Sequence, residues 1–149
     1  MPQSLAQIYV HLIFSTKDRM PVISEEVKPW LHAYIAGALN AISNSALKVG
    51  GVEDHVHILF RLSKNSALTD VVKAAKVESS KWMKKEGGVR EFAWQGGYGA
   101  FSVSASHLED VTEYVAKQEE RHRRRTFQEE FRILLERYKV EYNEAWVWD

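Results

Sequence analysis

Apolar and polar residues alternate along two stretches of the chain, at residues 7–15 and 55–62. In the first stretch, every second residue is apolar and shares one face: Ile8, Val10, Leu12 and Phe14. An alternation of period two predicts a β-strand that packs one face on a core. Shorter apolar stretches at 46–52 and 101–103 predict two more strands, and the first of these forms a hairpin with residues 55–62. Gly50-Gly51 within this hairpin favours a bulge or a bend.

Apolar residues recur at helical spacing in four other stretches, and each stretch opens on residues that commonly cap helices. These caps are Ser24, residues 63–66, Ser106 and Thr126. Glu109 and Glu129 follow the last two caps by three residues, which is the signature of a capping box. We expect the inward stripes to include Trp30 and Tyr34 in the first helix and Tyr138 in the last.

The order of these elements is strand, helix, strand, strand, helix, strand, helix, helix. Its first six elements match the split βαβ, ferredoxin-like pattern (βαββαβ), so we predict an α+β fold with an antiparallel sheet and additional C-terminal helices. Two helices cover one face of such a sheet, and we expect the Ser106 helix to cover the other. At 149 residues, the chain is expected to form one domain, 1–149, with a C-terminal helix and tail from about 126.

Composition narrows the functional classes. The formal net charge is zero, which weakens but does not exclude a nucleic-acid partner, because local patches matter more than totals. There is no cysteine, so disulfides and thiolate zinc sites are excluded, and a reducing cytoplasm fits. We see no signal peptide and no apolar run as long as a membrane span, which needs about 20 residues.

Two histidines, His55 and His57, lie on the polar face of one predicted strand. Strand geometry puts them side by side, roughly 7 Å apart, and two imidazoles at that spacing can bind one divalent ion. The alternative is an ordinary half-exposed polar face, since motif matches carry a real false-positive rate.

The Ser106 helix carries Tyr114 and Gln118 at the i, i+4 spacing that makes them neighbours. If this helix covers the open face of the sheet, its polar side meets His55 and His57. Two imidazoles and one amide oxygen then suit Mg²⁺ or Mn²⁺, and Tyr114 lies beside the ion. A tyrosine hydroxyl can attack phosphorus, so we predict phosphodiester cleavage with an enzyme-linked phosphate and a free hydroxyl.

Two features favour a nucleic-acid surface. Residues 61–90 contain eight basic and three acidic residues, and residues 92–101 form a loop rich in glycine and aromatic residues. Cations can contact phosphates and exposed rings can stack on unpaired bases, so affinity should fall steeply with salt. The candidate contacts are Lys73, Lys76, Lys81, Arg123, Arg124, Arg125, Trp94 and Tyr98. The alternatives are a solvated helix face and a loop whose rings complete the core.

His55-Val56-His57 resembles the HUH motif of single-strand nucleases, and Tyr114-Val115-Ala116-Lys117-Gln118 resembles the single-tyrosine motif of the insertion-sequence 200/605-type transposases, including their repetitive-palindrome-associated relatives. Residues 11–17, 94–103 and 127–131 carry supporting matches, so the resemblance covers nearly the whole chain.

The resemblance implies metal-dependent action on single-stranded DNA through a 5′-phosphotyrosine and a free 3′-OH, followed by strand transfer. It assigns His55, His57 and Gln118 to the metal and Tyr114 to the attack. It also implies recognition of hairpins near element ends and homodimers whose tyrosine helix serves the partner subunit. Many relatives carry His-His where this chain has Arg121-His122, and we expect Arg121 to contact DNA instead.

Two other functions stay open at this level. An HUH-class replication initiator or relaxase nickase usually takes a third histidine as ligand, and the larger ones carry extra domains. A non-catalytic single-stranded nucleic-acid-binding protein would need exposed rings on the third strand, where this chain has histidines.

Overall fold

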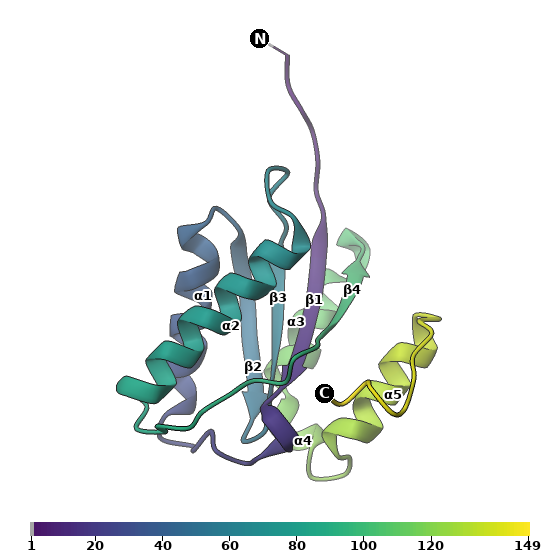
Figure 1. Cartoon of the computed structure of the whole chain (residues 1–149). Coiled ribbons are helices and arrows are strands. Elements are labelled where there is room, and N and C mark those ends of the chain that lie inside the picture. The colour runs from purple at the N-terminus through teal and green to yellow at the C-terminus, as the bar shows by residue number, and fades with distance from the viewer. Residues whose placement is uncertain (1) are drawn as a thin grey trace.

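The computed structural model describes residues 2–149 and confirms the predicted α+β fold. Its four strands form one antiparallel sheet in the order β2-β3-β1-β4, which is the order of the ferredoxin-like pattern (Figure 1). The strands are β1 (Tyr9–Ser15), β2 (Ser45–Val52), β3 (His55–Arg61) and β4 (Gly99–Val103).

Helices cover both faces of the sheet (Figure 1). Two of them pack with one face of β1 and β3, and the others lie on the opposite face, where the third helix packs on β2 and β3. The helices are α1 (Lys28–Ala41), α2 (Leu68–Lys85), α3 (Leu108–Ala116), α4 (Gln118–Arg121) and α5 (Phe127–Arg137), with short 3-10 turns η1 (Lys17–Arg19) and η2 (Ala105–His107).

The alternation along β1 and β3 separates a dry core from a polar face. The apolar side chains of both strands join α1 and α2 in the main core: Val10, Leu12, Phe14, Val56, Ile58 and Phe60. The residues between them point to the opposite face, under α3 and α5, where Ile13 packs with Phe101 and Phe131. His11, His55 and His57 share that second face, and all three are buried.

The glycines of β2 allow α3 to lie close to the sheet. A Cβ atom added at Gly50 would lie 2.1 Å from the Val115 carbonyl oxygen, so only a residue without a side chain fits there. The expected bulge at Gly50-Gly51 is wrong, because the register of β2 shifts between Ala46 and Lys48 instead. The close packing of α3 explains why glycine occupies position 50.

Helix starts follow the sequence only in part. The capping box of Thr126 and Glu129 is confirmed. The box at Ser106 is wrong, because Ser106 lies inside η2 and its hydroxyl contacts Ser104 and His107. The first helix begins at Lys28, later than Ser24 suggests, and α2 begins after Ala67 without a side-chain cap.

The predicted continuous helix after Ser106 is also wrong, because it breaks at Lys117, whose φ is −102° and ψ is 30°. Beyond the break, the Gln118 side chain turns back and its Nε2 donates to the Tyr114 carbonyl at 3.0 Å. This bond satisfies a backbone oxygen that the interrupted helix leaves without a partner. The break therefore fixes Gln118 next to the segment that carries Tyr114.

Three aromatic residues expected to point inward lie at the surface instead. Trp30 is 69% exposed, Tyr34 39% and Tyr138 38%. In α1 the narrower stripe of Leu31, Ile35 and Leu39 fills the interface with the sheet. Among the described helices, none is long and apolar enough to cross a membrane.

Candidate functional site

His55 and His57 are the centre of the polar face beneath α3, α4 and α5. Both side chains are completely buried, and their ring centroids lie 5.1 Å apart. The antiparallel pairing of β1 and β3 puts Ile13 opposite His57 and Ser15 opposite His55. The alternative of a half-exposed polar strand face does not hold, because both histidines are enclosed by neighbouring elements.

Helix α5 adds a carboxylate to this pair. Glu130 is 3% exposed, and its Oε1 lies 3.0 Å from Nε2 of His57 and 3.5 Å from Nε2 of His55. Nε2 of His122, which follows α4, donates to the same oxygen at 3.1 Å. One ligand atom from each of these four residues lies within 4.8 Å of the others. We call these four residues the histidine–glutamate cluster.

Gln118 lies against the cluster, as the sequence predicts for a residue near the two histidines. Its Oε1 accepts from Nε2 of His122 at 3.0 Å and faces Nε2 of His55 at 3.4 Å. The side chain is 1% exposed. The amide oxygen and the Glu130 carboxylate therefore both face the same group of imidazole nitrogens.

The outer nitrogens of both strand histidines have partners. Nδ1 of His55 donates to Asp54 Oδ1 at 2.7 Å, and Nε2 of His11 lies 2.7 Å from Nδ1 of His57. A hydrogen bond on the outer nitrogen fixes the ring orientation of a metal-binding histidine and its tautomer. Both Nε2 atoms are consequently directed into the cluster.

Burial and the carboxylates of Asp54 and Glu130 shift the pKa values of His55 and His57 in opposite directions. Burial opposes the charged form of His55, but its bonds to Asp54 and Glu130 outweigh burial and raise its pKa to about 9. Burial dominates at His57 and lowers its pKa to about 4 despite Glu130. Burial opposes ionisation of Glu130 too, yet the charge of His57 and the imidazole hydrogen bonds hold its pKa well below its usual value.

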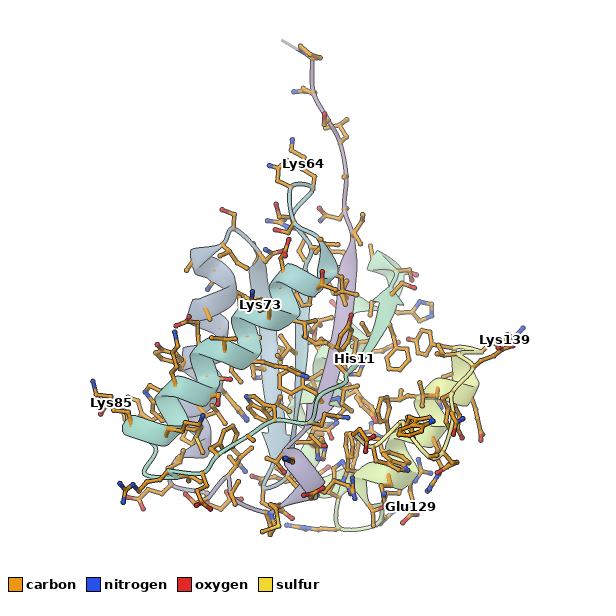
Figure 2. All side chains as sticks on the ribbon, in the orientation of Figure 1. His11, Lys64, Lys73, Lys85, Glu129 and Lys139 are labelled. Atoms are coloured by element: carbon orange, nitrogen blue, oxygen red, sulfur yellow. The ribbon has the colours of Figure 1, made fainter. Side chains whose placement is uncertain are left out.

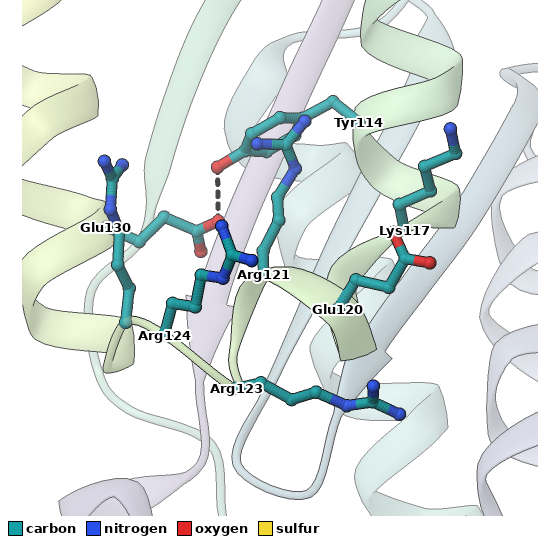
Figure 3. Close-up of a pocket in the computed structure, with 8 residues that line it drawn as sticks. Tyr114, Lys117, Glu120, Arg121, Arg123, Arg124 and Glu130 are labelled. Atoms are coloured by element: carbon teal, nitrogen blue, oxygen red, sulfur yellow. Dashed lines mark hydrogen bonds between the residues drawn. The ribbon is translucent and has the colours of Figure 1, made fainter.

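Tyr114 lies beside the cluster and bonds to its carboxylate, Glu130, as Figure 3 shows. Its hydroxyl donates to Glu130 Oε2, the carboxylate oxygen that does not face the histidines. The Arg121 guanidinium lies 4.1 Å from the centre of the Tyr114 ring. Burial first, and then the negative charge of Glu130, raise the pKa of the Tyr114 phenol.

A cavity of about 620 Å³ opens in front of Tyr114. We call it the arginine cavity, after the four arginines among its lining residues: Tyr114, Lys117, Glu120, Arg121, Arg123, Arg124, Arg125 and Glu130. Figure 3 shows Arg121 and Arg124 beside the Tyr114–Glu130 pair, with Arg123 at the far edge. A concentration of guanidinium groups beside a phenol suits a phosphate-bearing ligand.

The donor set of the cluster fits a divalent cation. Imidazole nitrogens and carboxylate or amide oxygens bind first-row divalent ions, and three imidazoles favour Mn²⁺ or a related ion over Mg²⁺. Glu130 and His122 were missed by the sequence reasoning. The supporting match at 127–131 includes Glu130. In the sequence, however, Glu130 only stands between apolar Phe127 and Phe131, whose spacing indicates a packed helix and no metal ligand.

The lysine candidates lie away from this site. Figure 2 shows Lys73 on α2, whose buried side packs on the sheet face opposite the one that carries His11 and the cluster. Lys73 and Lys81 are exposed there. Lys76 is half-buried, and its ammonium donates to the carbonyls of Gln95 at 2.7 Å and Gly97 at 2.6 Å. Lys76 therefore holds the glycine-rich loop.

The two aromatic candidates of that loop differ. Trp94 is 8% exposed, packs on Phe14 and Phe92, and donates its indole N–H to Ser79 at 2.9 Å. Its predicted role in base stacking is wrong, because its ring belongs to the main core. Tyr98 is 36% exposed, and the Lys76 ammonium lies 5.9 Å from its ring centre.

Comparisons with known proteins relate this chain to transposases. Residues 4–118 match the family described as Transposase IS200 like. A comparison with curated protein sequences finds no match. Among solved structures, a proposed transposase from Deinococcus radiodurans R1 superposes with a TM-score of 0.64 at 22% identity, over 77% of this chain and 95% of that one. A REP-associated tyrosine transposase bound to a REP hairpin gives a TM-score of 0.56 at 9% identity, over 77% of this chain and 68% of that one.

Proposed function

This chain belongs to the IS200-like transposase family, whose members are metal-dependent enzymes that act on DNA, and we propose a specific reaction for it. We infer that it cleaves and rejoins single-stranded DNA with Tyr114 as the nucleophile. The observation that carries the proposal is the position of the Tyr114 hydroxyl, which bonds to the carboxylate that the three imidazoles share. A nucleophile held beside a cation-binding cluster is suited to attack on a phosphodiester.

The step is a phosphoryl transfer to tyrosine. The Tyr114 oxygen forms a bond to phosphorus, the bond from phosphorus to the 3′ oxygen breaks, and the strand is left with a free 3′-OH after that oxygen takes up a proton. The phenolic proton passes to solvent, and Glu130 Oε2, whose low pKa makes it a weak base, accepts the hydroxyl hydrogen bond and holds Tyr114 in position. The product is a 5′-phosphotyrosine, which a 3′-OH can attack in turn to rejoin a strand.

His55, His57 and Gln118 would hold the divalent ion, Mn²⁺ or Mg²⁺, together with Glu130 or His122. The ion, when bound, supplies positive charge to a phosphate oxygen. Asp54 and His11 keep the two strand histidines oriented toward it. The two carboxylate oxygens of Glu130 have different roles: Oε1 faces the imidazoles of the cluster, and Oε2 accepts the hydrogen bond of the Tyr114 hydroxyl.

The DNA contacts are assigned to the arginine cavity. Arg121, Arg123, Arg124 and Arg125 present cations beside the nucleophile, where the scissile phosphate and its neighbours would lie. A hairpin next to the cleaved strand is proposed as the recognised structure, in accord with the hairpin bound to one structural neighbour. The homodimer implied by the family resemblance stays a prediction.

The test is a covalent adduct assay. The protein is incubated with Mn²⁺ and single-stranded DNA from the ends of its own element, and a DNA-linked band is measured after denaturation. We expect an adduct with the natural chain and none with Tyr114→Phe, which keeps the ring but lacks the hydroxyl. Tyr98→Phe, a half-exposed tyrosine outside the arginine cavity, is the matched control and should retain the adduct. An adduct that persists in Tyr114→Phe would refute the assignment.

Both alternatives fit the structure less well. A non-catalytic strand-binding protein of this fold would offer its open sheet face to bases, and here that face is covered by α3 and α5. A replication initiator or relaxase nickase would cleave at a plasmid origin, and the family match favours a transposase.

A further inference from the structure

A second cavity, of about 650 Å³, adjoins Tyr114 on the side of α5. Tyr114 and Arg121 line this cavity and the arginine cavity alike, so the two spaces meet at the nucleophile. The rest of the wall is mixed: it joins aliphatic and aromatic side chains to polar ones, among them Ser102, His107 and Asp110. The same wall includes Val111, Leu134, Arg137 and Tyr138.

One stripe of α5 connects the cluster to this second cavity. Leu134 follows Glu130 by four residues, and Arg137 and Tyr138 follow Leu134 by three and four, so all four lie along one side of the helix and its C-cap. The stripe begins at the carboxylate that holds the Tyr114 hydroxyl and ends about two turns further, roughly 12 Å along the axis. All four residues lie outside 4–118, the part of the chain that matches the family.

Tyr138 offers a flat aromatic surface to the cavity. One side of its ring stacks on Phe101, with centroids 4.7 Å apart and planes inclined by 29°. The residue is still 38% exposed and lines the cavity, so the ring retains accessible surface there. Phe101 belongs to the buried cluster under α5 and supports the tyrosine from below.

We propose that this second cavity is a base pocket, which receives the unpaired nucleobase next to the phosphate that Tyr114 attacks. This inference rests on the proposed function and adds the recognition of a base to it. The nucleobase stacks on Tyr138 and packs against Val111 and Leu134, while Arg137 contacts the polar edge of the base or the next phosphate. The guanidinium groups on the other side of Tyr114 bind the backbone.

The division of chemistry at Tyr114 favours a nucleobase over a phosphate in this pocket. A phosphate needs cations or backbone donors, and three arginines (Arg123, Arg124 and Arg125) line the arginine cavity alone, whereas Arg137 is the one arginine that lines the second cavity alone. An aromatic ring supported from one side and an aliphatic wall suit a planar base, because bases stack on exposed aromatic side chains. A strand that crosses the nucleophile must place consecutive nucleotides on its two sides, and the two cavities meet there.

The test is a coupled scan of abasic sites. The probe is the tightest binder selected from a pool of hairpin oligonucleotides with a randomised single-stranded flank. Abasic sites replace each flank nucleotide in turn, and equilibrium affinity is measured with Tyr114→Phe protein so that no strand is consumed. The scan is repeated in this background with Tyr138→Ala, and with Tyr138→Phe as the variant that keeps the ring.

We expect one flank position at which an abasic site weakens binding about tenfold in the parent and in Tyr138→Phe, but less than twofold in Tyr138→Ala. Tyr138→Ala itself should lose about tenfold with the intact probe. Equal abasic losses in all three proteins, at every position, would overturn the base pocket. The adduct assay with Tyr114 present is separate: if it fails while the coupling is found, the base pocket stands and the cleavage proposal falls.

Discussion

The hydrogen bond between His11 and His57 decides which nitrogen of His57 can face a cation. A metal-binding Nε2 must be unprotonated, so a neutral His57 then carries its proton on Nδ1. That proton needs an acceptor, and Nε2 of His11, 2.7 Å away and buried, is the partner that the fold supplies. The pKa of His11 is lowered to about 3 by burial and by His57, which keeps the His11 ring neutral and able to accept.

We therefore expect His11→Ala to weaken Mn²⁺ binding by about tenfold to hundredfold, because removal of an outer partner disturbs the bound ligand. Isothermal titration calorimetry of the purified chain measures the affinity directly. His32→Ala is the control, since His32 is a partly buried histidine of α1, the helix on the other face of the sheet. An unchanged affinity in His11→Ala would show that the His11 bond does not support the ion.

The sequence reasoning reached part of this site for a physical reason. The period of a strand put His55 and His57 on one face, and helical spacing joined Tyr114 to Gln118. Short-range geometry thus predicted each pair, and the expected fold, in which the helix covers the open face of the sheet, predicted that the two pairs meet. Glu130 and His122 could not be found in this way. Their positions depend on the helix break at Lys117 and on the turn before α5, and neither has a periodic signal.

At the scale of elements, the position of Tyr114 depends on how closely α3 approaches β2. Val115, the next residue, is completely buried, and its carbonyl lies where a Gly50 side chain would be. The helix cannot move away without exposing Leu59 and Val103, with which Val115 packs. The glycine in β2 thus fixes the distance between the tyrosine helix and the strand that carries the histidines.

Gly50→Ala should destabilise the chain by about 1–3 kcal/mol, because the added methyl group forces the helix and the sheet apart. Urea unfolding followed by circular dichroism measures the change. Gly37→Ala is the matched control: it lies within α1 with no neighbouring atom within 4 Å of an added Cβ. There we expect the opposite sign, a gain of about 0.5–1 kcal/mol, since alanine favours a helix interior. Equal effects of the two substitutions would contradict this account of α3 packing.

Element order and strand faces followed from the hydrophobic pattern, whereas helix starts did so less well. Thr126 caps α5 as predicted, because its hydroxyl and the Glu129 side chain are free to form the reciprocal bonds. Ser106 has the same spacing to Glu109, but it lies inside the 3-10 turn η2 and therefore does not occupy the N-cap position of α3. A capping motif marks residues that can satisfy the free N–H groups of a helix start, but tertiary packing determines where the helix starts.

At the scale of the whole molecule, the positive charge is divided between two faces of the sheet. The arginine cavity lies with the cluster, and the exposed lysines of α2 lie on the opposite layer. The formal net charge of zero hides this division. A strand bound at Tyr114 is therefore expected to meet the arginines and to leave Lys73 and Lys81 uncontacted.

Salt dependence separates the two sets of cations. Replacing Arg124 and Arg125 together by glutamine should make the plot of log affinity against log salt less steep by about 0.7 for each lost phosphate contact. Lys73→Gln with Lys81→Gln removes the same charge from α2 and should leave the slope unchanged. Fluorescence anisotropy with a labelled single strand gives both slopes. Equal flattening in the two variants would mean that the α2 surface also carries DNA.

The structure bears on whether one subunit supplies both the tyrosine and the histidines of a site. Tyr114 bonds to Glu130 of the same chain, and its ring centre lies 5.7 Å from that of His57 in the same chain. We expect each subunit to use its own tyrosine, whether or not the protein dimerises. Co-expressed Tyr114→Phe and His57→Gln subunits should then form no adduct, since neither contains a complete site. Co-expression of Tyr114→Phe with the natural chain is the control and should retain adduct on the natural subunit alone. Adduct recovered on the His57→Gln subunit would instead establish that the tyrosine acts on the partner's histidines, as the family resemblance suggests.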